Sequence, residues 1–125
     1  MGAFDQVVFD CERPSALARF WASVLDGYRV RDYDAAEVAR LAALGRTPET
    51  DPSVLVDGPG PSLCFQQIAT TSAARARIHL DVAVGDRARE VVRLRALGAS
   101  VMREASDYTV LADPEGNRFC VVQKR

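Results

Sequence analysis

The chain has 125 residues and a formal net charge of −1, from 16 Lys and Arg residues against 17 Asp and Glu residues. This length favours a single domain over 1–125, and the balanced charge argues against a nucleic-acid partner, which usually requires a basic excess. No run of about 18 apolar residues is present, so we expect no transmembrane helix and no membrane partner. The N-terminus lacks a secretory pattern and the cysteine count is three. We therefore expect a cytoplasmic protein with reduced thiols.

The first half of the chain predicts strands separated by two helices. Pro14 suits the first turn of a helix, and the apolar residues after it recur at helical spacing until Gly27, a typical stop signal. Asp34, with Glu37 three residues later, is a typical start for a second helix. The expected elements are strand 4–9, a helix from 14 to about 25, strand 28–33, a helix near 34–44, and strands 53–56 and 62–68.

The pattern of strand, helix and strands then repeats. The small, polar segment 69–76 is the best candidate for a linker within the domain. Asp86 is a candidate N-cap for a helix that Gly98 ends, with Val91, Leu94 and Leu97 expected to face the core. The expected elements are strand 78–84, this helix, and strands 100–103, 108–112 and 118–123, with a turn at 113–117 in which Gly116 or Asn117 takes positive φ.

Two short stretches suggest an internal duplication. Gly60, Cys64 and Gln67 have the same mutual spacing as Gly116, Cys120 and Gln123. Two copies are too few for a repeat array. We therefore predict two βαβββ modules, approximately 1–69 and 76–125, within one domain of the α+β class.

Four strings carry a family resemblance: FDCERPSALARFWASVL (9–25), LCFQ (63–66), RIHLDV (77–82) and VLADPEGNRFCV (110–121). Together they resemble the glyoxalase/bleomycin resistance protein/dioxygenase group, the vicinal oxygen chelate superfamily, and most of all its small single-domain bacterial glyoxalase-like members. The resemblance implies a glyoxalase-like fold, in which two βαβββ modules form a cupped mixed sheet around a cavity. It also implies a homodimer. In the enzymes of this group a divalent metal lies in the cup, whereas the antibiotic-binding resistance proteins hold a ligand without chemistry, so function has to be argued from the site.

The family's metal pattern, usually His, Glu, His and Glu, maps onto Gln6, Cys64, His79 and Cys120. Three of the four usual ligands are therefore replaced. Both carboxylates are missing, and with them the hard oxygen ligands that suit Mg²⁺, Mn²⁺ or Fe²⁺. The metal-bound Glu that serves as base in a glyoxalase has no equivalent here, which argues against that activity. These four residues are our candidates for the lining of a ligand cavity.

The same residues allow other interpretations. Cys64, His79 and Cys120 would form a soft zinc set if they converged, with Gln6 or water as fourth ligand. Alternatively the two cysteines are small buried apolar side chains, and His79 is a hydrogen-bonded structural residue. Asp81 is interpreted first as structural, and Cys11 is expected to be the most exposed thiol.

Three functional hypotheses follow. The first is a binding protein for a small organic molecule that uses no metal cofactor. The second is an enzyme of the lyase or isomerase type, with or without zinc, in which His79 acts as acid or base. The third is an interaction module whose cup is filled by its own side chains. What surrounds His79 distinguishes the three.

Overall fold

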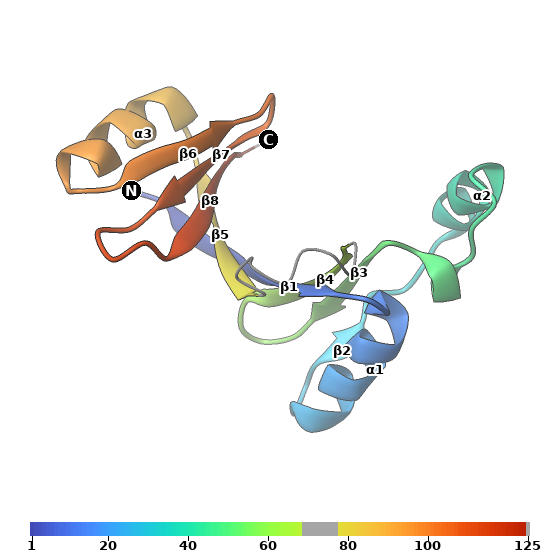
Figure 1. Cartoon of the computed structure of the whole chain (residues 1–125). Helices are drawn as coiled ribbons and strands as arrows, with labels where there is room; N and C mark the ends of the chain where they lie inside the picture. Colours follow the sequence, from blue (N-terminus) through green and yellow to red (C-terminus); the bar gives the residue numbers. More distant parts are fainter. Residues whose placement is uncertain (69–77, 125) are drawn as a thin grey trace. The chain divides into compact units, whose positions relative to one another are not determined.

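The computed structural model describes residues 1–68 and 78–124, which divide into two compact units (Figure 1). Unit 1 comprises residues 1–7 and 78–125, and unit 2 comprises residues 8–77. The predicted linker at 69–76 lies outside the described residues. Among the helices of the described part, none has the length and apolar character needed to span a bilayer.

Unit 2 holds the strand order β2-β3-β4-β1. The pairings of β2 with β3 and of β3 with β4 are antiparallel. Its elements are the second part of β1 (Ala3–Cys11), α1 (Pro14–Val24), β2 (Arg29–Val30), α2 (Ala35–Ala43), the short 3-10 helix η1 (Pro48–Thr50), β3 (Ser53–Asp57) and β4 (Ser62–Gln67).

The local signals explain most of these bounds. Pro14 is the first residue of α1, and the Asp34 carboxylate accepts a hydrogen bond from the Glu37 backbone N–H, which caps α2. The strand predicted at 28–33 is shorter, because only Arg29 and Val30 pair with β3 before Asp34 begins α2.

Aromatic stacking fills part of the interior of unit 2. The ring of Phe9 stacks on Phe65, which is fully buried, with 5.0 Å between centroids, and Trp21 lies 5.7 Å from Phe9. Phe20 does not join this core, because its side chain is 58% exposed. Helical spacing places both aromatic residues of α1 on one face, yet Trp21 contacts Phe9 of the sheet whereas Phe20 is largely exposed.

Unit 1 holds the strand order β1-β5-β8-β7-β6. β5 (Ile78–Val84) pairs with β8 (Arg118–Gln123) in parallel, and β8, β7 (Tyr108–Ala112) and β6 (Ser100–Glu104) pair antiparallel. The helix α3 (Arg87–Ala96) follows β5, and the Asp86 carboxylate caps it by accepting from the Arg89 backbone N–H. Mixed strand pairing combined with helices confirms the α+β class.

One face of the unit 1 sheet packs against α3. Val84, Leu111 and Val121 form its buried centre, with Val91 and Leu94 of the helix packed against them. Leu97, which the helical spacing also placed in the core, is 66% exposed, because the helix has ended at Ala96 and the chain turns away there.

The opposite face of this sheet follows from strand alternation and register. Successive side chains of a strand point to opposite faces, so His79 and Asp81 face away from the α3 side of the sheet, to which Val82 and Val84 point. Asp81 is in register with Cys120, Cys120 with Val110, and Val110 with Arg103. We call this the site face, formed by His79 and Asp81 of β5, Arg118, Cys120 and Val122 of β8, Tyr108 and Val110 of β7, and Arg103 of β6.

A glycine after α3 gives a test of this fold. Gly98 has φ +111, and a Cβ there would lie 3.2 Å from Pro114 Cγ. We expect Gly98→Ala to lower the free energy of unfolding by about 1–2 kcal/mol, because an L side chain is strained at positive φ. Gly85→Ala is the control, since no heavy atom lies within 4 Å of its Cβ position. Equilibrium urea unfolding measures both, and equal effects would contradict the expectation.

Candidate functional site

The candidate site lies on the site face, where β5 and β8 run side by side. His79 and Asp81 are two residues apart on β5, so their side chains point to the same side. The parallel register sets Cys120 of β8 opposite Asp81. Three groups that carry chemistry therefore meet at one place because of strand alternation and one register.

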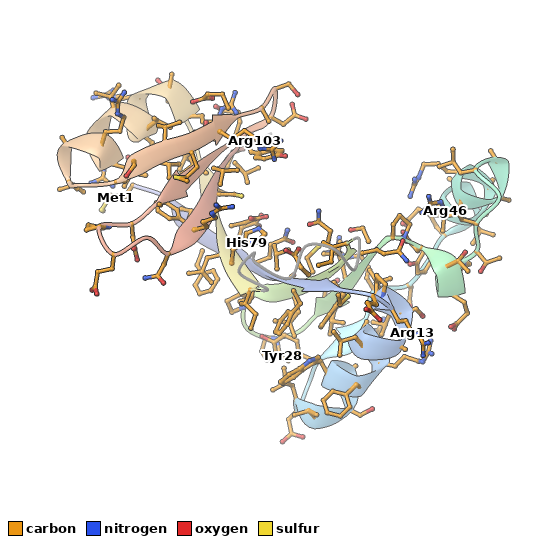
Figure 2. The ribbon with its side chains drawn as sticks, in the orientation of Figure 1. Met1, Arg13, Tyr28, Arg46, His79 and Arg103 are labelled. Atoms are coloured by element: carbon orange, nitrogen blue, oxygen red, sulfur yellow. The ribbon has the colours of Figure 1, made fainter. Side chains whose placement is uncertain are left out.

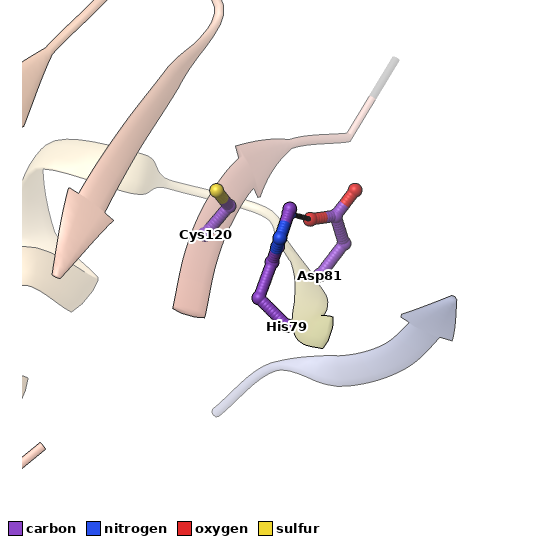
Figure 3. Close-up of side chains that lie close together, drawn as sticks. All are labelled: His79, Asp81 and Cys120. Carbon is purple, nitrogen blue, oxygen red and sulfur yellow. Dashed lines mark ion pairs between the residues drawn. The ribbon is translucent and has the colours of Figure 1, made fainter. Parts of the chain in front are cut away.

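Their atoms are close enough to interact directly. His79 Nε2 lies 3.4 Å from Asp81 Oδ1, and Gln6 Nε2 donates a hydrogen bond of 2.8 Å to Asp81 Oδ2. One nitrogen of His79, one oxygen of Asp81 and the sulfur of Cys120 all lie within 4.8 Å of one another (Figure 3). The side chains of His79 and Asp81 are 21% and 13% exposed, and Cys120 is half-buried. The group is thus partly shielded from solvent but not fully buried.

The electrostatics of the group favour a protonated histidine. Hydrogen bonding to the Asp81 carboxylate, followed by hydrogen bonding to Cys120, raises the pKa of His79 to about 10, although burial of the ring opposes the rise. An imidazolium has two N–H donors and serves two acceptors at once. At neutral pH, His79 is therefore a cation and a hydrogen-bond donor.

The structure brings together three of the four residues that the sequence proposed for the cavity. Gln6, His79 and Cys120 join the group, Gln6 through its bond to Asp81. Cys64 lies in unit 2, buried at 7% exposure, with its sulfur 3.7 Å from Ser53 Oγ. The assignment of all four to one ligand cavity stays a prediction.

Asp81 is the member whose role sequence analysis missed. It was interpreted as structural, yet it contacts both His79 and Gln6. The available signal was its spacing of two residues from His79 on a predicted strand, which places both side chains on one face. The prediction for Cys11 was wrong: this side chain is 4% exposed, whereas Cys120 is half-buried.

A hollow of about 400 Å³ lies elsewhere in unit 1, near the beginning of α3. The polar side chains that line it already serve the fold. Arg87 donates to the carbonyls of Ala105 and Ser106, and Glu104 accepts from the Thr109 hydroxyl. None of the candidate site residues is among its lining residues, so it offers a ligand fewer uncommitted polar groups than the site face does.

The glyoxalase-like domain model matches residues 6–122, which is nearly the whole chain. The chain belongs to the glyoxalase-like domain family. Among curated proteins, no sequence matches this one.

Solved structures agree with the fold of a glyoxalase-like domain. A glyoxalase/bleomycin resistance protein/dioxygenase superfamily member from Vibrio splendidus 12B01 has a TM-score of 0.58 at 15% identity, covering 99% of this chain and 100% of the other. Methylmalonyl-CoA epimerase from Mycobacterium tuberculosis has a TM-score of 0.59 at 12% identity, with 98% and 87% covered. At these identities the likeness shows the fold alone.

The group on the site face differs from the donor set that the family resemblance implies, although one donor atom each of His79, Asp81 and Cys120 lies close enough together to hold a metal ion. The Gln6 amide nitrogen donates to Asp81, so only the carbonyl oxygen of Gln6 could serve as a ligand. Zinc accepts His, Asp and Cys donors, but it requires a neutral imidazole and a thiolate. Asp81 faces His79 with one oxygen and Gln6 with the other. The zinc set of Cys64, His79 and Cys120 stays a prediction.

The single histidine of this chain allows its pKa to be tested directly. We expect the NMR signal of the His79 ring to titrate near pH 10, and Asp81→Asn to move the midpoint back towards the ordinary value of about 6.5. Because the pKa of His79 is higher in the folded protein than in the unfolded chain, protonated His79 stabilises the fold. This contribution to the free energy of unfolding is complete below about pH 6.5 and is lost as the pH rises through about 10. Asp107→Asn, at an exposed position of the same unit, is the control. An unchanged midpoint in the Asp81 variant would contradict the assignment.

Proposed function

We propose that this glyoxalase-like domain binds a small organic molecule with an anionic or carbonyl oxygen on the site face, without a metal cofactor. The observation that carries the proposal is the contact of the partly exposed His79 ring with the Asp81 carboxylate, at 3.4 Å between Nε2 and Oδ1, which raises the pKa of His79 and favours a cationic hydrogen-bond donor on this face. A buried or half-buried donor of this kind is what fixes the orientation of a small polar ligand in a largely apolar site. The neighbouring Val110 and Val122 supply apolar surface on the same face.

The charges of the site face point to an organic anion. His79, Arg103 and Arg118 are cationic there, and the residues assigned to this face include one carboxylate, Asp81, which is already engaged. Arg103, which is labelled in Figure 2, donates to the Tyr108 hydroxyl and lies over the Tyr108 ring. Within residues 1–68 and 78–124, neither Arg103 nor Arg118 forms an ion pair. In the described part of the chain, Arg103 and Arg118 thus present positive charge on this face that no carboxylate pairs with, which favours anionic partners.

The second candidate is an enzyme of the lyase or isomerase type, with His79 as the proton donor. The close approach of an imidazolium, a carboxylate and a thiol is the observation that favours it, because such groups move protons at a carbonyl-bearing substrate. One structural neighbour is a methylmalonyl-CoA epimerase. Product formation from a bound ligand would favour this candidate over simple binding.

A fluorescent organic anion tests the binding proposal. We expect 8-anilinonaphthalene-1-sulfonate to bind saturably to protein treated with a chelator, with no gain on adding Zn²⁺ or Mn²⁺. His79→Gln and Arg118→Ala should each weaken binding by about tenfold, the size expected for one charge-assisted hydrogen bond. Arg95→Gln is the control, because Arg95 is exposed on α3. Binding that requires added metal, or that falls equally in the control, would count against the proposal.

We also propose that this cytoplasmic protein forms a homodimer. β6 is last in the strand order and is exposed throughout, including Val101 at 36% and Met102 at 49%. An open strand edge with apolar side chains is a surface on which another chain can pair. We expect sedimentation equilibrium to give twice the monomer mass, and Met102→Lys to shift the protein towards monomer. A monomer at all accessible concentrations would refute this.

A further inference from the structure

We infer that Cys120 is a nucleophilic thiol that forms a thioether with an α,β-unsaturated carbonyl compound, with His79 as its partner in proton transfer and Asp81 as a positioning residue. The inference deepens the proposed function, because it uses the same face and names a chemical class of ligand. It goes beyond reversible binding, because it adds a covalent bond.

Three features of the geometry carry this inference. The sulfur of Cys120 lies within 4.8 Å of the nitrogen of His79 and of a carboxylate oxygen of Asp81, so nucleophile, proton carrier and orienting acid are adjacent. This is the arrangement by which proteins activate a cysteine. Asp81 Oδ2 in turn accepts a hydrogen bond of 2.8 Å from Gln6 Nε2. The order of contacts is thus thiol, imidazole, carboxylate and amide, on three neighbouring strands.

Exposure separates Cys120 from the other two cysteines. Cys11 and Cys64 are buried, at 4% and 7% exposure, whereas Cys120 is half-buried on the site face. A buried cysteine behaves as a small inert apolar side chain, whereas an accessible sulfur beside an imidazole can be activated as a nucleophile.

The covalent step balances without any further reactant. The thiol gives its proton to solvent water, and the sulfur attacks the β-carbon, forming a C–S bond as the C=C π pair moves towards the carbonyl. The imidazolium of His79 stabilises the resulting enolate oxygen by hydrogen bonding, donates a proton to the α-carbon and recovers one from water. One S–H and one C=C are converted into one C–S and one C–H. No leaving group departs, and nothing is oxidised or reduced by an external agent.

The other groups of the site face favour this electrophile class. A carbonyl conjugated to the alkene gives the imidazolium an oxygen to stabilise, which an alkyl halide does not. Arg118 is on the same strand as Cys120, two residues away and therefore on the same face. An electrophile with a carboxylate substituent would find its counter-charge there.

The test uses N-ethylmaleimide at pH 6 on the whole reduced chain, with peptide mass mapping of the alkylated site. We expect one fast adduct, at Cys120, formed about tenfold or more faster than with glutathione, because the sulfur of glutathione has no imidazole held beside it. His79→Gln should lower the rate towards that of glutathione, and Arg95→Gln should leave it unchanged. Reaction of Cys120 at the glutathione rate, or first reaction at Cys11 or Cys64, would overturn the inference.

Two further comparisons separate the failure of the nucleophile from misfolding of the variant and from failure of the proposed function. The alkylation rate of wild-type Cys120 is compared with that of glutathione, and this comparison requires no variant, so misfolding of His79→Gln would not obscure it. The far-UV circular dichroism of the His79→Gln protein shows whether that variant is folded. Anilinonaphthalene sulfonate binding is measured on the same wild-type sample. Binding with a slow thiol refutes the nucleophile and leaves the proposed function intact, whereas a fast thiol without binding refutes the proposed function alone.

Discussion

The parallel pairing of β5 with β8 is the constraint on which the candidate site depends. It sets Asp81 opposite Cys120, and strand alternation then adds His79 on the same face. A shift of the register by one residue would place Phe119 or Val121 opposite Asp81 and would expose the residues that now pack under α3. The apolar core beneath the sheet therefore holds the polar group above it in place, since both depend on one register.

The polar side chains of the candidate site are partners for one another. The carboxylate of Asp81 faces a histidine on one side and an amide on the other, and the histidine faces both the carboxylate and a thiol. A half-buried charge is tolerated when it is paired and hydrogen-bonded. The group leaves a thiol and an imidazolium at the surface of the sheet, which are the two components needed for nucleophilic addition with proton return. The glyoxalase-like domain thus carries on its site face a group that combines an imidazole, a carboxylate and a thiol.

The sequence predicted most elements because their signals are local. The Pro14 start, the Asp34 and Asp86 caps and the Gly98 stop are all present as expected, since each depends on backbone hydrogen bonds within a few residues. The strands 78–84, 108–112 and 118–123 were predicted with their observed bounds. Burial was predicted less well. Phe20 and Leu97 have the right spacing but are exposed, because spacing defines a face and only a neighbouring element decides how much of that face is covered.

For the site, the sequence by itself determined the residue types and their strands: a single histidine, and two cysteines at matching positions of two similar stretches. It also determined the family, because four local strings carry it. Only the tertiary structure decided that Asp81 belongs with His79 and Cys120, that Cys11 is buried and that Cys64 lies in the other unit. The reason is physical. Capping and alternation act over a few residues, whereas the meeting of positions 6, 81 and 120 depends on strand pairing between distant segments, whose register the local sequence does not encode.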